Sequence, residues 1–374
     1  MAKINWTYTP TTKKETGYED LPEKFYLDPQ NFNSLSVEEQ DSLIQELISW
    51  IRTKNHFPIY YFNDEGIKEE ILKVAKKKDV KVEDGQLVTQ SSTGLLVLDY
   101  LFPNLHCVNA GYYDGNSMID RFNNDKILAQ CLKGYMQRYP LNSMRTAFFQ
   151  LGRMLWQTAT NFAPMRAKAI YEYAAKPGAR IYDYSCGFGG RMLGCLASKN
   201  DYYYIGCEPN TDTYEHLQEL GAHIAAATGA PCHYKLYNCC SEDLVLDDNS
   251  IDFAFSCPPF FAFERYSEEE TQCYNKFPLY NDWLEGYVRP TIRNIYKALK
   301  SGCCMATDIL DVNWRNVDYH LVADWKRIAI EEGFEFVESI PVLSRSNARK
   351  KVNDNPDKME QVYFFKKTIK IVDL

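Results

Sequence analysis

The chain has 374 residues, 45% of them hydrophobic, which is enough for two domains or for one core with a large appendage. A net charge of −8 does not fit a protein that binds nucleic acid over a broad basic surface, so any DNA contact must rest on a local patch. No apolar run approaches the roughly 20 residues of a membrane span. The first residues lack the charged-then-apolar pattern of a secretion signal, so we expect a cytoplasmic location.

The twelve cysteines include no Cys-x-x-Cys pair, and no histidine pair has zinc-like spacing. In a chain without a secretion signal, such cysteines are expected to be reduced and mostly buried. The sequence therefore predicts no metal site. It does not indicate an oligomeric state.

Residues 1–140 are predicted to form a mixed α/β appendage. Ser36-Val37-Glu38-Glu39 has the pattern of a helix capping box. The expected elements are helices at 36–51 and 67–78, strands at 56–62, 87–88 and 95–100, and helices at 123–137 and 142–158. They leave two roles open for this region, target or partner recognition and a purely structural role.

Residues 141–374 alternate short apolar strands with helices, which predicts a mostly parallel sheet covered on both faces. Asn161-Phe162-Ala163-Pro164 opens the helix that leads into this domain, since proline suits a first helical turn. Pro290, inside a helical pattern from Trp283 to Lys300, is expected to kink or restart that helix. Strands are expected at 180–184, 203–208, 232–237, 251–256, 303–307, 334–343 and 360–367, with helices between the first six and an antiparallel hairpin made by the last two.

Three motifs follow strands of this sheet. Asp183-Tyr184-Ser185-Cys186-Gly187-Phe188-Gly189-Gly190-Arg191 is a glycine turn between a strand and a helix, where glycines let the backbone approach a ligand closely. Glu208 ends the next strand, where an acid can accept both hydroxyls of a ribose. Cys257-Pro258-Pro259-Phe260 stops a later strand, because prolines cannot continue a sheet interior. Strand ends of an open α/β sheet converge on one rim, so we expect one site.

In that order, the motifs resemble those of the class I S-adenosylmethionine (SAM) methyltransferases. That resemblance implies a Rossmann-like, mostly parallel seven-stranded sheet with an antiparallel C-terminal hairpin. The segments from Ser256 to Tyr266 and from Tyr280 to Trp283 are more narrowly similar to DNA methyltransferases of bacteria and phages that modify adenine N6 or cytosine N4. The resemblance covers residues 160–367. It implies SAM as the cofactor and DNA as the partner, with the target base flipped out of the helix.

The resemblance also implies roles for single residues on the cofactor side. Asn161 and Phe162 would close over the methionine end of SAM, although a helix cap and a core aromatic are the alternative. Arg191 would pair with the carboxylate of SAM, Glu208 would bind its ribose, and Glu242 would lie near its adenine. The residues expected to bind the cofactor are Asn161, Phe162, Asp183, Ser185, Gly187, Gly189, Gly190, Arg191, Glu208, Ser241, Glu242 and Ser256.

The acceptor side is the motif Cys257, Pro258, Pro259 and Phe260, whose members are the catalytic candidates. An exocyclic base amine is a poor nucleophile because its lone pair is delocalised into the ring. In the family, the first side chain and the proline carbonyl bind the amine N–H groups, while the aromatic residue stacks on the base.

Further substrate contacts are expected from side chains on the same rim. Core packing is the alternative for the aromatic ones, and a solvated hairpin loop is the alternative for the basic ones, which would meet phosphates. These residues are Glu264, Tyr266, Tyr280, Trp283, Arg345, Arg349 and Lys350.

The sequence departs from the family pattern at Cys257, where Asp, Asn or Ser is usual. A thiol is a weak acceptor, so Ser256 or the Pro258 carbonyl would have to take over its role. A cysteine before proline also raises a second mechanism, C5 methylation of a pyrimidine through a thiolate. Two further functions stay open: methylation of an RNA, nucleotide or protein amide, which the acidic charge favours, and a SAM-binding pseudoenzyme or assembly subunit.

Overall fold

The computed structural model describes residues 8–78, 81–83, 85–88, 91–110, 116–155, 158–229, 232–343 and 360–368. The chain divides into two compact units. The first comprises Met1–Ile67 and Asp99–Thr160, and the second comprises Lys68–Leu98 and Asn161–Leu374. This division differs from the single boundary expected near residue 140, because the segment Lys68–Leu98 belongs with the second unit.

The first unit is built mainly of helices around its own apolar core. Its longest helix, α2 (Val37–Lys54), begins with the expected capping box, in which Ser36 Oγ accepts from the Glu39 backbone N–H and the Glu39 carboxylate accepts from the Ser36 N–H. In the core, the rings of Phe57 and Phe122 meet edge to face, 5.3 Å apart at their centroids. The other elements are β1 (Lys14–Glu15), α1 (Pro29–Ser34), β2 (Tyr61–Phe62), β5 (Asn109–Ala110), α5 (Met118–Asn123), α6 (Asp125–Met136), α7 (Met144–Leu155), and 3-10 turns at Glu23–Phe25 and Pro103–Cys107.

Two expected strands of the N-terminal region are wrong. Residues 95–100 form the helix α4 (Leu95–Leu101), since a short apolar run does not by itself distinguish a buried strand from a buried helix. Of residues 56–62 only Tyr61–Phe62 are a strand, and Pro58 lacks the N–H that a longer strand would need. The helix expected at 67–78 is α3 (Asp64–Lys76).

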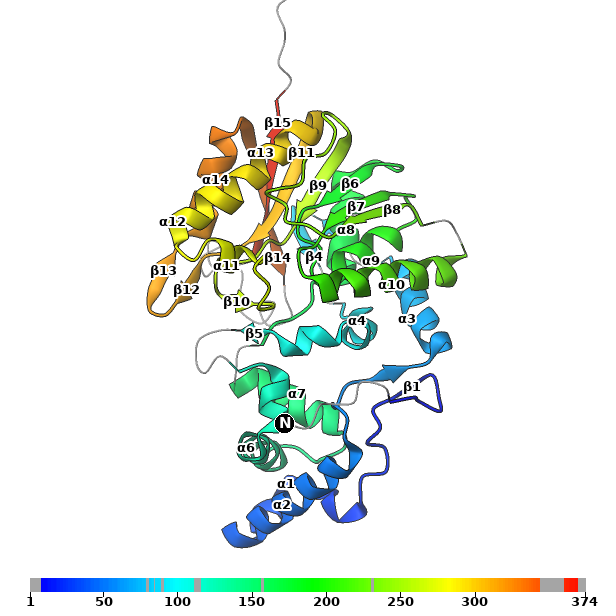
Figure 1. Ribbon diagram of the computed structural model, residues 1–374. Helices are drawn as coiled ribbons and strands as arrows, with labels where there is room; N and C mark the ends of the chain where they lie inside the picture. The colour runs from blue at the N-terminus through cyan, green and yellow to red at the C-terminus, as the bar shows by residue number, and fades with distance from the viewer. Residues whose placement is uncertain are drawn as a thin grey trace, which may run out of the picture. The chain divides into compact units, whose positions relative to one another are not determined.

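The second unit is organised around one large sheet (Figure 1). Its strands are β3 (Lys81–Glu83), β4 (Gln86–Val88), β6 (Arg180–Asp183), β7 (Tyr203–Cys207), β8 (Tyr234–Tyr237), β9 (Ile251–Ser256), β11 (Leu299–Ile309), β14 (Phe334–Leu343) and β15 (Gln361–Lys367). Their order across the nine-stranded sheet is β3-β4-β14-β15-β11-β9-β6-β7-β8. From β11 to β8 neighbouring strands are parallel, whereas β15 runs antiparallel to β11 and to β14. The predicted sheet and its antiparallel hairpin are therefore present, and β3 and β4 extend it beside β14.

Helices cover both faces of this sheet. Figure 1 shows α8 (Pro164–Ala174), α9 (Gly190–Leu196) and α10 (Thr211–Thr228) on one side, and α13 (Arg289–Ala298) and α14 (Leu321–Glu331) on the other. Within the described residues, none of the helices combines the length and the apolar character that crossing a membrane requires.

Two features between the strands bear on the sequence predictions. No helix separates β8 from β9, where one was expected, because the run Asp247-Asp248-Asn249-Ser250 favours turns. A π-helical turn at Leu284–Val288 precedes α13 and places Pro290 in the first turn of that helix, so the predicted restart is confirmed. The remaining elements are β10 (Glu264–Arg265), α11 (Cys273–Lys276), α12 (Tyr280–Trp283), β12 (Val312–Trp314) and β13 (Val317–Tyr319).

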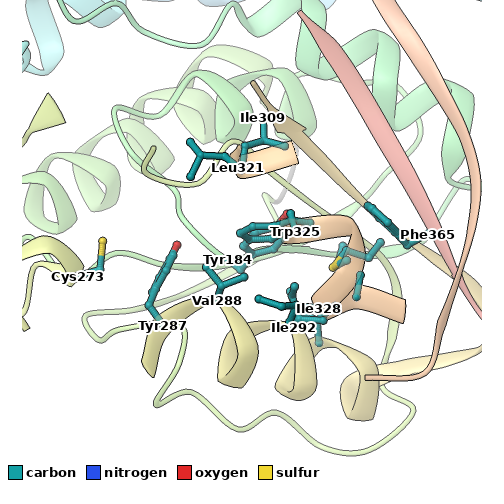
Figure 2. Packing of buried hydrophobic residues seen from close by; sticks show 14 of the residues in the cluster. Tyr184, Cys273, Tyr287, Val288, Ile292, Ile309, Leu321, Trp325, Ile328 and Phe365 are labelled. Carbon is teal, nitrogen blue, oxygen red and sulfur yellow. The ribbon is translucent and has the colours of Figure 1, made fainter. Parts of the chain in front are cut away.

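The core on the α13–α14 side holds the sheet in place. Figure 2 shows Tyr184, which directly follows β6, beside Trp325 of α14, and their rings stack with centroids 6.2 Å apart. Ile292 of α13 and Ile328 of α14 belong to the same buried cluster. Fully burying an apolar side chain of this size contributes roughly 1.5–3 kcal/mol. This packing therefore fixes the backbone just where β6 gives way to the glycine turn.

Candidate functional site

The three sequence motifs lie at the carboxyl ends of β9, β6 and β7, which are adjacent and parallel. Ligands of open α/β sheets bind beyond such ends. The segments that follow these strands are the residues 257–260, the glycine turn and Glu208. The structure thus brings the motifs to one rim, as expected.

The glycine turn has the backbone that its sequence predicts. Gly187 has φ +55° and Gly189 has φ +75°, a region that favours glycine, and Gly189 caps the start of α9. Gly190 is required for a different reason, because a Cβ there would lie 1.9 Å from the carbonyl oxygen of Phe162. The turn is therefore held tightly on the side of Phe162, whereas the nearest atom to a Cβ at Gly187 would be 3.9 Å away.

Asp183 is fully buried and is linked by its side chain to both neighbouring strands, β7 and β9. Its Oδ2 accepts from Arg191 Nε at 2.9 Å and from the Tyr204 hydroxyl at 2.7 Å, and its Oδ1 accepts from Ser256 Oγ at 2.8 Å. Arg191 also donates to the carbonyl of Ser185. The structure thus gives Asp183 and Arg191 partners inside the protein, and their expected contacts with the cofactor stay predictions.

Glu208, the residue expected to bind the ribose, directly follows β7 and is buried. One of its oxygens accepts from the backbone N–H of Gly187 at 2.9 Å, and the other accepts from that of Asn210 at 3.0 Å. Burial raises the pKa of Glu208 to about 7, although the two backbone N–H groups oppose the shift. Each carboxylate oxygen keeps a second lone pair for another donor.

Asn161 and Phe162 lie against the glycine turn. The Asn161 side-chain amide donates to the carbonyl of Phe188, and the ring of Phe162 lies 5.1 Å from the guanidinium of Arg166 and 5.3 Å from that of Arg191. The segment that opens α8 therefore contacts the glycine turn, and its closure over SAM stays a prediction.

The residues after β8 are engaged with other side chains. Ser241 Oγ lies 2.9 Å from Thr291 Oγ1, and Lys276 Nζ donates to Glu242 at 2.6 Å and to Asp243 at 2.9 Å. Among the described residues, Glu242 and Asp243 form with Cys240 a group of metal-ligand type within 4.8 Å. Lys276 already supplies the cation that both carboxylates bind. Burial raises the pKa of Glu242.

The segment 257–260 follows β9 directly and belongs to neither a helix nor a strand. Pro258 is buried, whereas Cys257, Pro259 and Phe260 are partly exposed. The next residue, Phe261, is buried and has φ +55°, an uncommon conformation for an aromatic residue that costs of order 1–3 kcal/mol. Its ring is held by an aromatic cluster made of Tyr280, Trp283, Trp314 and Tyr319.

Of the seven residues expected to contact the substrate, the structure describes four, and these divide into two groups. The Tyr266 hydroxyl donates to Glu264, and the Tyr266 ring lies 6.2 Å from that of Phe188 in the glycine turn, so this pair belongs to the rim. Trp283 is 1% exposed and donates to Cys273 Sγ, which is the core-packing alternative. Tyr280 stacks on Trp283 and donates to Asp324. Arg345, Arg349 and Lys350 lie outside the described residues.

Sequence analysis missed an acid at the same rim. Asp308, the second-last residue of β11, is fully buried and lies 3.3 Å from Arg166 Nη1 of α8, which also pairs with Glu360. Burial raises the pKa of Asp308, and the charge of Glu360 adds to that shift. The rule that strand ends carry function would have found it, because the expected strand ended at Thr307.

Comparison with known proteins adds distant structural likenesses. No protein-family model matches the chain, and no curated protein matches it. A TehB-like SAM-dependent methyltransferase from Corynebacterium glutamicum is 14% identical, with a TM-score of 0.35 over 59% of this chain and 94% of that one. TrmN from Thermus thermophilus is 16% identical, with a TM-score of 0.37 over 55% of this chain and 48% of that one. A SAM-dependent O-methyltransferase from Thermotoga maritima is 15% identical, with a TM-score of 0.35 over 58% of this chain and 70% of that one.

These scores are too low to carry an argument about chemistry. The strand order of the second unit is the stronger observation, because it places the antiparallel β15 between β11 and β14. By that order, the second unit has the Rossmann-like fold of the class I methyltransferases.

Proposed function

We propose that the protein is a SAM-dependent methyltransferase that transfers a methyl group to an exocyclic amine of a DNA base, adenine N6 or cytosine N4. The observation that carries the proposal is the meeting of the glycine turn, Glu208 and the segment 257–260 at adjacent strand ends. A cofactor pocket and an acceptor loop on one rim are what a direct transfer requires, since the enzyme mainly aligns the nucleophile, the methyl carbon and the sulfur.

The residues of the rim fit the cofactor. Gly187 carries no side chain that would stand between the backbone and a ligand, so the backbone of the turn can approach a ligand closely. Glu208 is positioned by two backbone N–H groups and retains lone pairs for the two ribose hydroxyls. Asn161 and Phe162 border the same turn from α8. Bound SAM would supply an electrophilic methyl group, which the chain itself does not contain.

The acceptor side fits a flat, flipped base. Phe260 is partly exposed beside the two prolines, which suits an aromatic platform for a base. Tyr266 and Glu264 border the rim near the glycine turn and offer a further wall and an acid. The net charge of −8 keeps RNA, nucleotide and protein-amide acceptors as the alternative within the same chemistry.

C5 methylation through Cys257 is less well supported. A cysteine nucleophile needs a lowered pKa, usually from a nearby positive charge. Burial raises the pKa of the Cys257 thiol well above its ordinary value, the charge of Asp308 adds to the shift, and Arg191 opposes it only in part. The thiol is therefore protonated at neutral pH. The pseudoenzyme hypothesis is tested by methyl transfer from labelled SAM.

The test is methyl transfer from labelled SAM to unmodified genomic DNA, followed by mass analysis of the nucleosides. N6-methyladenine or N4-methylcytosine is the expected product. 5-Methylcytosine would instead make Cys257 the nucleophile. No incorporation into DNA, with binding of S-adenosylhomocysteine intact, would overturn the DNA assignment, and RNA, nucleotides and protein would be assayed in the same way to separate another acceptor from a pseudoenzyme.

Replacing Phe260 with alanine is expected to lower transfer by about a hundredfold while SAM binding is kept, since stacking on a base is worth about 1–3 kcal/mol by alanine substitution and misplacement of the acceptor costs further rate. Cofactor binding is measured by calorimetry. The matched control is Phe336→Ala, an exposed phenylalanine on β14. Transfer at the wild-type rate by Phe260→Ala would place the acceptor site elsewhere.

A further inference from the structure

Asp308 stands beside the one residue at which the chain departs from the amino-methyltransferase pattern. β11 and β9 are parallel, and Thr307 lies opposite Ser256. Asp308 and Cys257 directly follow this last registered pair, and the charge of Asp308 is the largest electrostatic influence on the Cys257 thiol, so the two side chains lie near each other. A carboxylate thus occupies the neighbouring strand at the position where an amine-binding group is missing.

The two faces of β11 at this point differ in what they contact. Thr307 Oγ1 lies 2.7 Å from the Tyr184 hydroxyl, on the side of the α13–α14 core. Successive side chains of a strand point to opposite faces, so Asp308 points to the other side. There its Oδ2 pairs with Arg166 Nη1 of α8, the helix that opens with Asn161 and Phe162. Asp308 is therefore on the face that borders the cofactor turn.

One oxygen of Asp308 has no donor among the described residues. Asp308 is fully buried, and its Oδ1 has no hydrogen-bond partner among the residues that the structure describes. Leaving a buried acceptor unsatisfied costs about 1–3 kcal/mol, and more for a charged group. Arg166 compensates the charge through Oδ2 but does not bond Oδ1. A substrate N–H group would satisfy this oxygen, which an ion-pair role alone does not.

Cys257 cannot serve in its place. Its thiol is a weak acceptor and, with a raised pKa, holds its proton. The negative charge of Asp308 is the first electrostatic cause of that shift, which is consistent with the closeness that the strand register implies. The two residues therefore form a pair in which the carboxylate is the stronger acceptor.

Resting on the proposed function, we propose that Asp308 is a catalytic residue whose Oδ1 accepts an N–H of the substrate amine, in the role that Asp, Asn or Ser has at the position of Cys257 in the family. In the step, the nitrogen lone pair forms the bond to the methyl carbon, and the carbon–sulfur bond breaks with its electron pair going to the sulfur. The amine nitrogen then gives one proton to Asp308, and the carboxyl group releases it to solvent. The products are the methylated amine and S-adenosylhomocysteine.

The experiment compares the full wild-type chain with four variants, and a fifth variant, Glu360→Gln, is added for the pH profile. Asp308→Asn keeps an oxygen acceptor but removes the proton acceptor. Asp308→Ala combined with Arg166→Met removes the acceptor and, at the same time, the guanidinium that, among the described residues, would keep only Glu360 as its ion-pair partner. Removing one partner of a buried ion pair by itself costs about 3–5 kcal/mol. Asp308→Asn combined with Cys257→Asp moves the carboxylate to the position usual in the family. Asp311→Asn, an exposed acid after β11, is the matched control.

Single-turnover methyl transfer to DNA is measured at saturating SAM, with melting temperature and S-adenosylhomocysteine calorimetry as readouts that do not depend on activity. Because a positioned acid or base contributes about a hundredfold or more, the Asp308→Ala/Arg166→Met protein is expected to lose at least that much rate. Its melting temperature and its affinity for S-adenosylhomocysteine should stay near the wild-type values. Asp308→Asn is expected to lose about tenfold, and Cys257→Asp in that background is expected to restore most of the loss. The control should match the wild type.

The pH dependence separates catalysis from structure. Among the described residues, the charged or titratable groups that influence Asp308 are Arg166 of α8, Arg191 of α9, Cys257 after β9 and Glu360 before β15. The wild-type rate is expected to decrease as the pH is lowered through the pKa of Asp308, and the profile of Asp308→Asn should lack this decrease. Glu360→Gln should move this decrease to lower pH, because Glu360 is a neighbouring charge that raises the pKa of Asp308. A purely structural role would leave the shape of the profile unchanged.

The outcomes are distinguishable. Wild-type transfer that persists in the Asp308→Ala/Arg166→Met protein overturns the role of Asp308 and leaves the proposed function standing. Loss of rate in every Asp308 variant with an unchanged pH profile and no rescue by Cys257→Asp also overturns it, in favour of a structural ion pair. A wild-type protein that binds S-adenosylhomocysteine but does not methylate DNA overturns the proposed function, and this inference falls with it.

Discussion

Acidification from about pH 8 to about pH 6 is expected to weaken the binding of S-adenosylhomocysteine about tenfold, because the carboxyl group of Glu208 titrates in this interval. Burial raises its pKa to about 7, against the opposing effect of the backbone N–H groups of Asn210 and Gly187. Only the ionised form accepts from both ribose hydroxyls. With that pKa, the ionised fraction falls from about nine-tenths to about one-tenth, which corresponds to about 1.4 kcal/mol of binding free energy.

Isothermal titration calorimetry across this pH range measures the effect. Glu208→Gln keeps the size of the side chain but cannot ionise, so its affinity should be lower than that of the wild type at high pH and flat with pH. Glu215→Gln, an exposed acid on α10, is the matched control and should keep the wild-type slope. A wild-type affinity that is constant, or that increases toward acid, would refute a ribose-binding role for Glu208.

The same group has the opposite effect on folding stability. Its pKa is raised from an ordinary 4.5, so the folded state binds the proton more tightly than the unfolded state. The contribution of Glu208 to the free energy of unfolding is therefore greatest below about pH 4.5 and is lost as the pH rises through about 7, a change of about 3 kcal/mol. Urea unfolding of the wild type and of Glu208→Gln at several pH values measures the difference. With rising pH, the affinity for S-adenosylhomocysteine should increase while the contribution of Glu208 to the free energy of unfolding decreases. An exposed acid would not produce this combination.

Two further predictions concern the residues around the rim. Asp183→Ala is expected to lower the free energy of unfolding by about 3–5 kcal/mol, because it leaves the buried Arg191 without its carboxylate partner. Asp183→Ala combined with Arg191→Met should recover much of that loss in urea unfolding. Equal stability of the single and double variants would show that the ion pair is not what Asp183 contributes. 5-Fluorocytosine in DNA traps C5 methyltransferases through their cysteine. This protein is expected to form no covalent complex with such DNA, because the raised pKa keeps Cys257 protonated. A shifted band on a denaturing gel that disappears with Cys257→Ser would contradict this prediction.

The parts of the fold that sequence analysis predicted correctly have strong local signals. The strand at 334–343 and the antiparallel pairing of the last two strands follow from runs of β-forming residues without a helix between them. The restart before Pro290 follows from the missing proline N–H. The helix α4, expected as a strand at 95–100, was mistaken because its apolar run carries no period that separates the two structures.

The candidate site was predictable in its backbone and less so in its partners. Glycine spacing and strand ends locate the turn and Glu208, because these depend on neighbours in the sequence. The pairing of Asp183 with Arg191 and Tyr204 depends on which side chains the sheet brings together, and no local pattern contains that information. The same holds for Asp308, whose relation to Cys257 exists only through the register of β11 against β9.

The register also explains how a cysteine can stand at a position where an acceptor is usual. Neighbouring parallel strands present residues at the same height of the sheet, so a function at the end of one strand can be supplied from the end of the next at a distance of about 4.8 Å. The desolvation that makes a buried carboxylate costly also makes it a stronger proton acceptor than an exposed one. Arg166 compensates the charge through one carboxylate oxygen, and the other oxygen has no donor within the described part of the chain. An acid held in this way has the chemistry that the thiol of Cys257 lacks, which is why the loss of an acceptor from the motif does not by itself imply a loss of catalysis.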